Sequence, residues 1–147
     1  MLEALVDHIV EQWSVTAVLP RTEGRSGLDA LIIVLEAIRG QYHHDPRSLR
    51  VLYALMFEAV APGVELTPRF VEQHRNLRDS VAATIRRGID DGSIIADAQP
   101  DAEADFIVSV LRAGYQWRLD PTHFDPVRSL DHLIATTRTR LRRTRRR

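Results

Sequence analysis

Few residues of this chain could do chemistry, and the densest group of them is the run His43-His44-Asp45. Imidazoles and carboxylates bind metals, but a metal site needs their donor atoms to converge on one point. Adjacent residues of a chain point in different directions, and Pro46 makes Asp45 typical of a helix cap. We therefore expect a solvated segment here and no metal site.

A second group consists of Glu72, His74 and Arg75, and it could support acid-base chemistry. Histidine titrates close to neutral pH, which makes it the usual proton donor or acceptor. The spacing of the surrounding apolar residues places His74 on the apolar side of a helix. Two interpretations are open: a hydrogen-bonded histidine of the core, or a polar group that lines a cavity.

Known catalytic motifs are missing from the sequence. It contains no His-Glu-x-x-His, no Gly-x-Ser-x-Gly and no glycine-rich phosphate loop. It also contains no cysteine, which excludes disulfides, thiolate metal sites and cysteine nucleophiles. We therefore predict a protein that is not an enzyme and that needs no cofactor.

The composition is that of an ordinary globular domain. Hydrophobic residues make up 44% of the 147 residues and charged residues 27%, which is enough for one packed core. No run approaches 18 apolar residues, and no basic stretch precedes an apolar run near Met1. We expect a cytoplasmic protein that does not enter a membrane.

A net charge of zero hides an uneven distribution. After Asp131 there are no acidic residues, and the last residues carry seven arginines: Arg138, Arg140, Arg142, Arg143, Arg145, Arg146 and Arg147. We divide the chain into a helical domain, 1–137, and an Arg-rich tail, 138–147. The tail is either a solvated helix end whose charge suits the helix dipole, or a contact for nucleic acid or an acidic partner.

Apolar residues recur at helical spacing along the whole chain, and no segment alternates as a strand would. Proline after a capping residue, as in Thr67-Pro68 and Asp125-Pro126, marks helix starts. Glycines, including Gly40 and Gly92, are expected at helix ends. The sequence predicts an all-α fold of six helices, at about 2–13, 28–39, 46–60, 67–91, 100–118 and 126–141.

The predicted helix 100–118 is the centre of this arrangement. One narrow polar stripe runs along this helix, and apolar residues occupy both sides of it. The stripe consists of Asp105, Ser109, Arg112 and Gln116. Such a helix must be covered from two directions, and a second copy of the chain would supply one cover. The candidate interface residues on this helix and on the last one are Phe106, Val110, Trp117, Leu130, Ile134 and Leu141. The alternative is that they belong to the core of one chain.

The order of these segments carries a family resemblance. A long helix ends in Arg87-Gly88-Ile89-Asp90-Asp91-Gly92-Ser93-Ile94; a linker, a helix with Ala104 and Gly114, an Asp-Pro loop and a final helix follow. This arrangement resembles the C-terminal domain of TetR-type transcriptional regulators over essentially the whole chain. The resemblance implies a bundle that dimerises through its last two helices and encloses a pocket for a small inducer.

The resemblance also implies where a ligand binds. Aromatic residues and methionine at helical spacing are often simple core, but the corresponding helices in the family surround the inducer. The candidate ligand-binding residues are Trp13, Leu35, Tyr53, Met56, Phe57, Phe70, His74 and Leu77. The expected ligand is small and mostly apolar. Met1 falls at the first helix of such a domain, so operator DNA would be bound only through a helix-turn-helix domain that this chain does not contain.

The expected function is therefore effector sensing and dimerisation in a TetR-type repressor, in which ligand binding changes the relative position of the subunits. Two other functions are open. A stand-alone ligand carrier or small helical enzyme could use the same pocket, with His74 as its one candidate polar group. A protein-interaction module would need no cavity at all.

Overall fold

A computed structural model describes residues 2–13, 18–59, 63 and 67–144, apart from the side chains of residues 2, 3, 12, 13 and 113. Over these residues the chain forms helices and no strand, which confirms the all-α class. The helices are α1 (Leu2–Trp13), α2 (Leu19–Thr22), α3 (Gly27–His44), α4 (Pro46–Glu58), α5 (Thr67–Asp90), α6 (Pro100–Leu111), α7 (Ala113–Leu119) and α8 (Pro126–Leu141). None of the described helices is long and apolar enough to cross a membrane.

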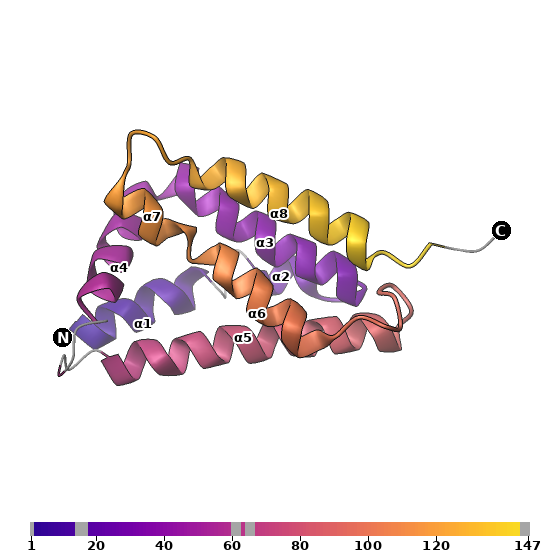
Figure 1. Ribbon diagram of the computed structural model, residues 1–147. Helices are drawn as coiled ribbons and strands as arrows, with labels where there is room; N and C mark the ends of the chain where they lie inside the picture. The colour runs from indigo at the N-terminus through magenta and orange to yellow at the C-terminus, as the bar shows by residue number, and fades with distance from the viewer. Residues whose placement is uncertain (1, 14–17, 60–62, 64–66, 145–147) are drawn as a thin grey trace.

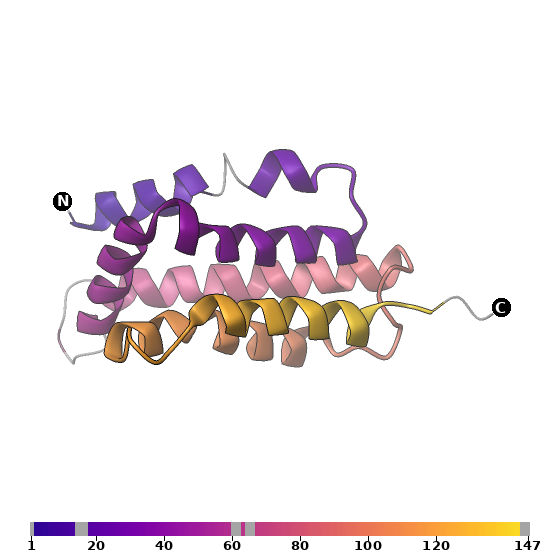
Figure 2. The ribbon, with the colours of Figure 1, turned by 90° about the horizontal axis from the view of Figure 1, so that it is seen from above.

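Helix α3 lies at the centre of the molecule and packs against α5 and α8 along its length (Figure 1). It runs antiparallel to both of them. Seen from above, α1 and α2 lie along one side of α3, and α6, α7 and α8 lie toward the opposite side (Figure 2). Helix α6 crosses from α5 to α8 and so closes the core, whose fully buried residues include Leu31, Leu35, Ile85, Ile107 and Leu130.

The segment from Arg87 to Ile94 joins the ends of three helices. The carboxylate of Asp91 accepts a 2.7 Å hydrogen bond from Gly27 N at the start of α3. Leu28 N donates to Ser93 Oγ at 3.1 Å, and Ile95 N donates to the carbonyl oxygen of Leu141 at the end of α8. Hydrogen bonds from Ser93 are the main reason that the pKa of Asp91 is lowered. This segment therefore connects α5, α3 and α8 at one end of the bundle.

The predicted helix 100–118 is not continuous, so that part of the prediction is wrong. It breaks at Arg112 into α6 and α7, and Tyr115 N donates to the carbonyl oxygen of Arg112 rather than to that of Leu111. The freed carbonyl of Leu111 accepts a hydrogen bond from the Tyr53 hydroxyl at 3.3 Å. At the break, the carbonyl of Leu111 is therefore hydrogen-bonded to a side chain of α4 and not to the backbone of its own helix.

Two other boundaries also differ from the prediction. Gly40 does not end its helix, because α3 continues to His44 and stops only where Asp45 begins to cap α4 by accepting a hydrogen bond from Ser48 N. The short helix α2 lies between the first two predicted helices and was not predicted. The helix starts at Pro46, Thr67, Pro100 and Pro126 agree with the prediction.

Candidate ligand-binding cavity

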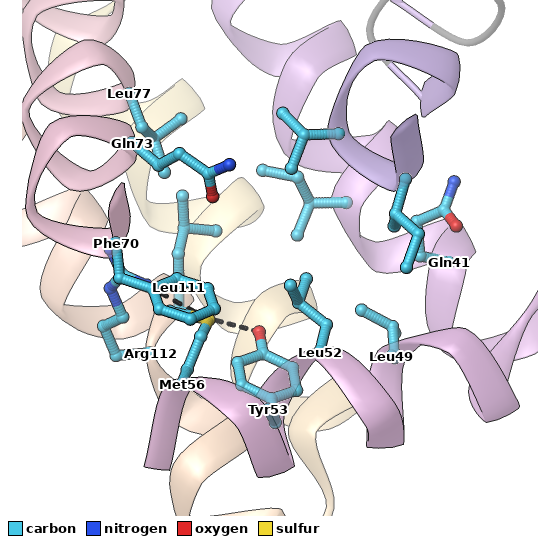
Figure 3. A pocket seen from close by; sticks show the side chains of 13 residues that line it. Gln41, Leu49, Leu52, Tyr53, Met56, Phe70, Gln73, Leu77, Leu111 and Arg112 are labelled. Atoms are coloured by element: carbon cyan, nitrogen blue, oxygen red, sulfur yellow. Dashed lines mark hydrogen bonds between the residues drawn. The ribbon is translucent and has the colours of Figure 1, made fainter. Parts of the chain in front are cut away.

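A cavity of about 190 Å³ lies between α1, α3, α4, α5 and the end of α6 (Figure 3). Most of its lining is apolar, and the three polar residues are Gln41, Gln73 and Arg112. The apolar lining consists of Ile9, Val10, Ile38, Leu49, Leu52, Tyr53, Met56, Phe70, Leu77 and Leu111. An apolar cavity with a few polar groups at defined positions is the usual form of a small-molecule site.

Four of the eight candidate ligand-binding residues line this cavity: Tyr53, Met56, Phe70 and Leu77 (Figure 3). They lie on α4 and α5, whose apolar faces converge there. Their helical spacing predicted that they are buried, and the resemblance to TetR-type regulators was the reason for expecting them at a ligand pocket.

The other candidates lie elsewhere. Leu35 is completely buried in the core and does not line the cavity. Phe57 is nearly half exposed and packs on the ring of Tyr115, with 6.3 Å between ring centroids. His74 is exposed on α5 and contacts Arg112 from outside the cavity lining. The side chain of Trp13 lies outside the described residues.

Tyr53 is held in place by the break between α6 and α7. Its hydroxyl donates to Leu111 O and accepts a 3.2 Å hydrogen bond from the Tyr42 hydroxyl. Its ring lies directly against Gly114, where an added Cβ would come within 2.0 Å of the ring. Burial raises the pKa of both tyrosines, so both hydroxyls stay protonated. Tyr53 thus forms a fixed, neutral part of the cavity wall, and Tyr42 holds its hydroxyl from outside the lining.

Arg112 is the residue at the break, and its place in the cavity lining was not predicted. The sequence analysis placed it only in the narrow polar stripe of the predicted helix 100–118. Its side chain instead lies at the edge of the cavity, half-buried, with Nη1 3.8 Å from the sulfur of Met56 and Nη2 2.7 Å from Nδ1 of His74. A guanidinium only donates hydrogen bonds, so Nδ1 of His74 is the acceptor and carries no proton.

The candidate interface residues divide into two groups. Three of them, Leu130, Ile134 and Leu141, are buried in the core of their own chain, as the alternative interpretation from the sequence expected. Trp117 is partly buried, with Tyr42 against its edge and Arg50 over its ring. Phe106 remains 48% exposed on α6, and Val110 is half-buried on the same helix.

The remaining predicted features are at the surface. His43 and His44 are exposed at the end of α3, and no group of potential metal ligands occurs among the residues that the structure describes. The boundary that we predicted at 137/138 falls inside α8. Arg138 and Arg140 belong to that helix and form ion pairs with Glu36 and Glu103. The last three arginines, 145–147, lie outside the described residues.

No family model matches this chain, and neither a curated protein nor a solved structure matches it. The chain's own residues are therefore the basis for inferring its function.

Proposed function

We propose that this chain is the effector-sensing and dimerisation domain of a TetR-type transcriptional regulator, and that its cavity binds a small, mostly apolar ligand. The observation that supports this proposal is the position of the cavity. Its lining includes Leu111 and Arg112, the two residues at which α6 gives way to α7, and both of these helices pack on α8.

This position offers a route from ligand to subunit arrangement. A ligand in the cavity contacts the break directly, and the Tyr53–Leu111 hydrogen bond couples the break to α4. A small change at the break would move α7 relative to α8. If α6 and α8 form the contact with a second copy, the two subunits then change their relative position, and ligand binding and dimer geometry become coupled.

In such a regulator a helix-turn-helix domain binds the operator. We assign that role to none of the helices in the described part of the chain. The chain's contribution is to hold two subunits together and to change their arrangement when the ligand binds.

Ligand binding can be tested with neutral compounds such as toluene, benzyl alcohol and benzamide. We expect calorimetry to detect binding and NMR to show perturbed methyl signals at Leu49, Leu52 and Leu77, which line the cavity. Leu52→Phe should weaken binding about tenfold or more, or ~1.4 kcal/mol, because the larger ring occupies the ligand's space.

Leu55→Phe is the matched control. Leu55 lies on the same helix and is partly buried, but it does not line the cavity. Its substitution should leave ligand affinity nearly unchanged, and circular dichroism should show both variants folded. Absence of binding to every compound, or equal affinities in the two variants, would refute a ligand-binding role for this cavity.

A further inference from the structure

Arg112 differs from the other arginines near the core in having only neutral partners. The guanidinium groups of Arg69, Arg78 and Arg140 each pair with a carboxylate. Over the residues that the structure describes, no carboxylate lies within 4.0 Å of Arg112, whose recorded partners are a thioether and an imidazole. A guanidinium has five N–H donors, so Arg112 can donate further hydrogen bonds to a ligand.

The charges around Arg112 do not neutralise it. Asp105 is close enough to affect His74, but its carboxylate is bound to Arg78 at 2.6 Å. Burial and the positive charge of Arg112 lower the pKa of His74, which therefore stays neutral at physiological pH. The edge of the cavity consequently carries an unbalanced positive charge next to an apolar interior.

The other polar groups of the lining do not supply an anion either. The Tyr53 hydroxyl is already hydrogen-bonded at both sides, to Tyr42 and to Leu111. Gln41 and Gln73 are neutral amides, and Gln73 is the donor in a long contact with Asp7. Among the described residues, the one charged side chain in the cavity lining is therefore that of Arg112, and an anionic group on the ligand would supply it with a charged hydrogen-bond acceptor.

Resting on the proposed ligand-binding function, we propose that the cavity binds a small organic monocarboxylate. The apolar body of the ligand fills the space between α1, α4 and α5, and its carboxylate accepts hydrogen bonds from Arg112. Guanidinium and carboxylate match each other as a planar, two-point pair. The cavity of about 190 Å³ is slightly larger than the one of ~150 Å³ that holds benzene in another protein, so bodies of about six to eight carbons fit.

The test compares benzoate with benzamide, which has nearly the same shape and no charge. Calorimetry on the full chain should show benzoate binding at least about tenfold more tightly, since a charge-assisted pair in a partly buried site outweighs a neutral one. Hexanoate and hexanamide form a second pair with a flexible body. Benzoate affinity should fall as NaCl is raised, while benzamide affinity should stay constant.

Arg112→Gln should remove the preference for benzoate, because it should weaken the binding of benzoate and leave the binding of benzamide unchanged. Arg75→Gln is the matched control, because Arg75 is exposed on α5 and does not line the cavity. Arg112→Lys keeps the charge but loses the two-point geometry, and should give an intermediate preference. The salt titration needs only the wild-type chain, so it decides the question even if Arg112→Gln does not fold.

The outcomes separate this inference from the proposed function. If benzamide and toluene bind but benzoate binds no better, or if salt leaves benzoate affinity unchanged, the cavity is a site for neutral ligands and the carboxylate proposal is wrong. The same holds if Arg112→Gln weakens benzoate and benzamide equally. If none of these compounds binds, both the carboxylate proposal and the ligand-binding function fail.

Discussion

At the scale of single residues, the contact between His74 and Arg112 makes a prediction about pH. Burial first, and then the charges of Arg112 and Arg78, lower the pKa of His74, while Asp105 acts in the opposite direction. The unfolded chain therefore binds a proton at a higher pH than the folded chain does. Stability should rise with pH through the normal histidine range, and His74→Gln should flatten that rise.

NMR titration of the imidazole of His74 checks this directly. In the wild type its pKa should lie below the usual histidine value, and in Arg112→Gln it should move upward because a neighbouring cation is gone. Bound benzoate should also raise it, whereas benzamide should not. An identical His74 titration in the wild type and Arg112→Gln would mean that the guanidinium is not held against this ring.

At the scale of elements, the break between α6 and α7 depends on Gly114. This glycine has no positive φ, so it is required for space and not for backbone conformation. An added Cβ would lie 2.0 Å from the Tyr53 ring, so Gly114→Ala must displace that ring and its hydrogen bond to Leu111. We expect a loss of about 2–3 kcal/mol in the free energy of unfolding, measured by urea denaturation, together with loss of ligand binding.

Gly40→Ala provides the matched control on another helix. Gly40 lies inside α3, and a Cβ there would meet only the His44 ring, at 3.4 Å. The alanine should stabilise the chain by about 0.5–1 kcal/mol, because it restricts the unfolded backbone and favours helix. If Gly114→Ala stabilised the protein to the same extent, the close packing of Tyr53 on Gly114 would be ruled out.

The ends of the helices show which parts of the fold can be predicted from the sequence. The starts at Pro46, Pro100 and Pro126 were predictable because capping and proline geometry are local properties. Gly92 was also predictable, since it follows α5 with a φ of +77°. The break at Arg112 could not be predicted, because it depends on the hydrogen bond from Tyr53 to the carbonyl of Leu111, and these two residues are 58 positions apart in the chain.

The same distinction holds for the cavity. Periodicity predicts that Tyr53, Met56 and Phe70 face inward, but it does not distinguish a cavity lining from packed core, and it was the resemblance that suggested a cavity. The place of Arg112 could not be predicted, because its position follows from the interrupted helix. Periodicity also predicts the apolar stripe of α8 but not what covers it. Helices α3, α6 and α7 of the same chain pack on α8, and Leu130, Ile134 and Leu141 are buried.

At the scale of the whole molecule, the burial of those three residues leaves the outer faces of α6 and α8 as the contact that we propose for a dimer. There Phe106 is half exposed beneath the guanidinium of Arg140, 5.2 Å from the ring centroid, and Ala135 and Thr139 are exposed on α8. Small residues let another helix approach closely, and an exposed aromatic ring is a typical anchor of an interface. A second copy related by a two-fold axis would place these faces together.

Phe106→Arg should therefore weaken dimerisation about a hundredfold or more, because it puts an unpaired charge at the centre of the contact. Analytical ultracentrifugation at micromolar concentration measures this. Val71→Arg is the control, since Val71 is 42% exposed on α5, similar to the 48% of Phe106, and lies outside the proposed contact. A wild-type chain that is monomeric, or equal effects of the two variants, would exclude this interface.

The dimer measurement also separates a sensor from a carrier. Linkage requires that a ligand which changes the subunit arrangement binds the two arrangements of the dimer with different affinities, and we expect its affinity for the dimer to differ from that for the Phe106→Arg monomer. A carrier with the same cavity would bind equally in both states, because nothing connects its site to the partner. Ligand affinity that differs between the dimer and the Phe106→Arg monomer would favour the sensor, whereas equal affinities would favour the carrier.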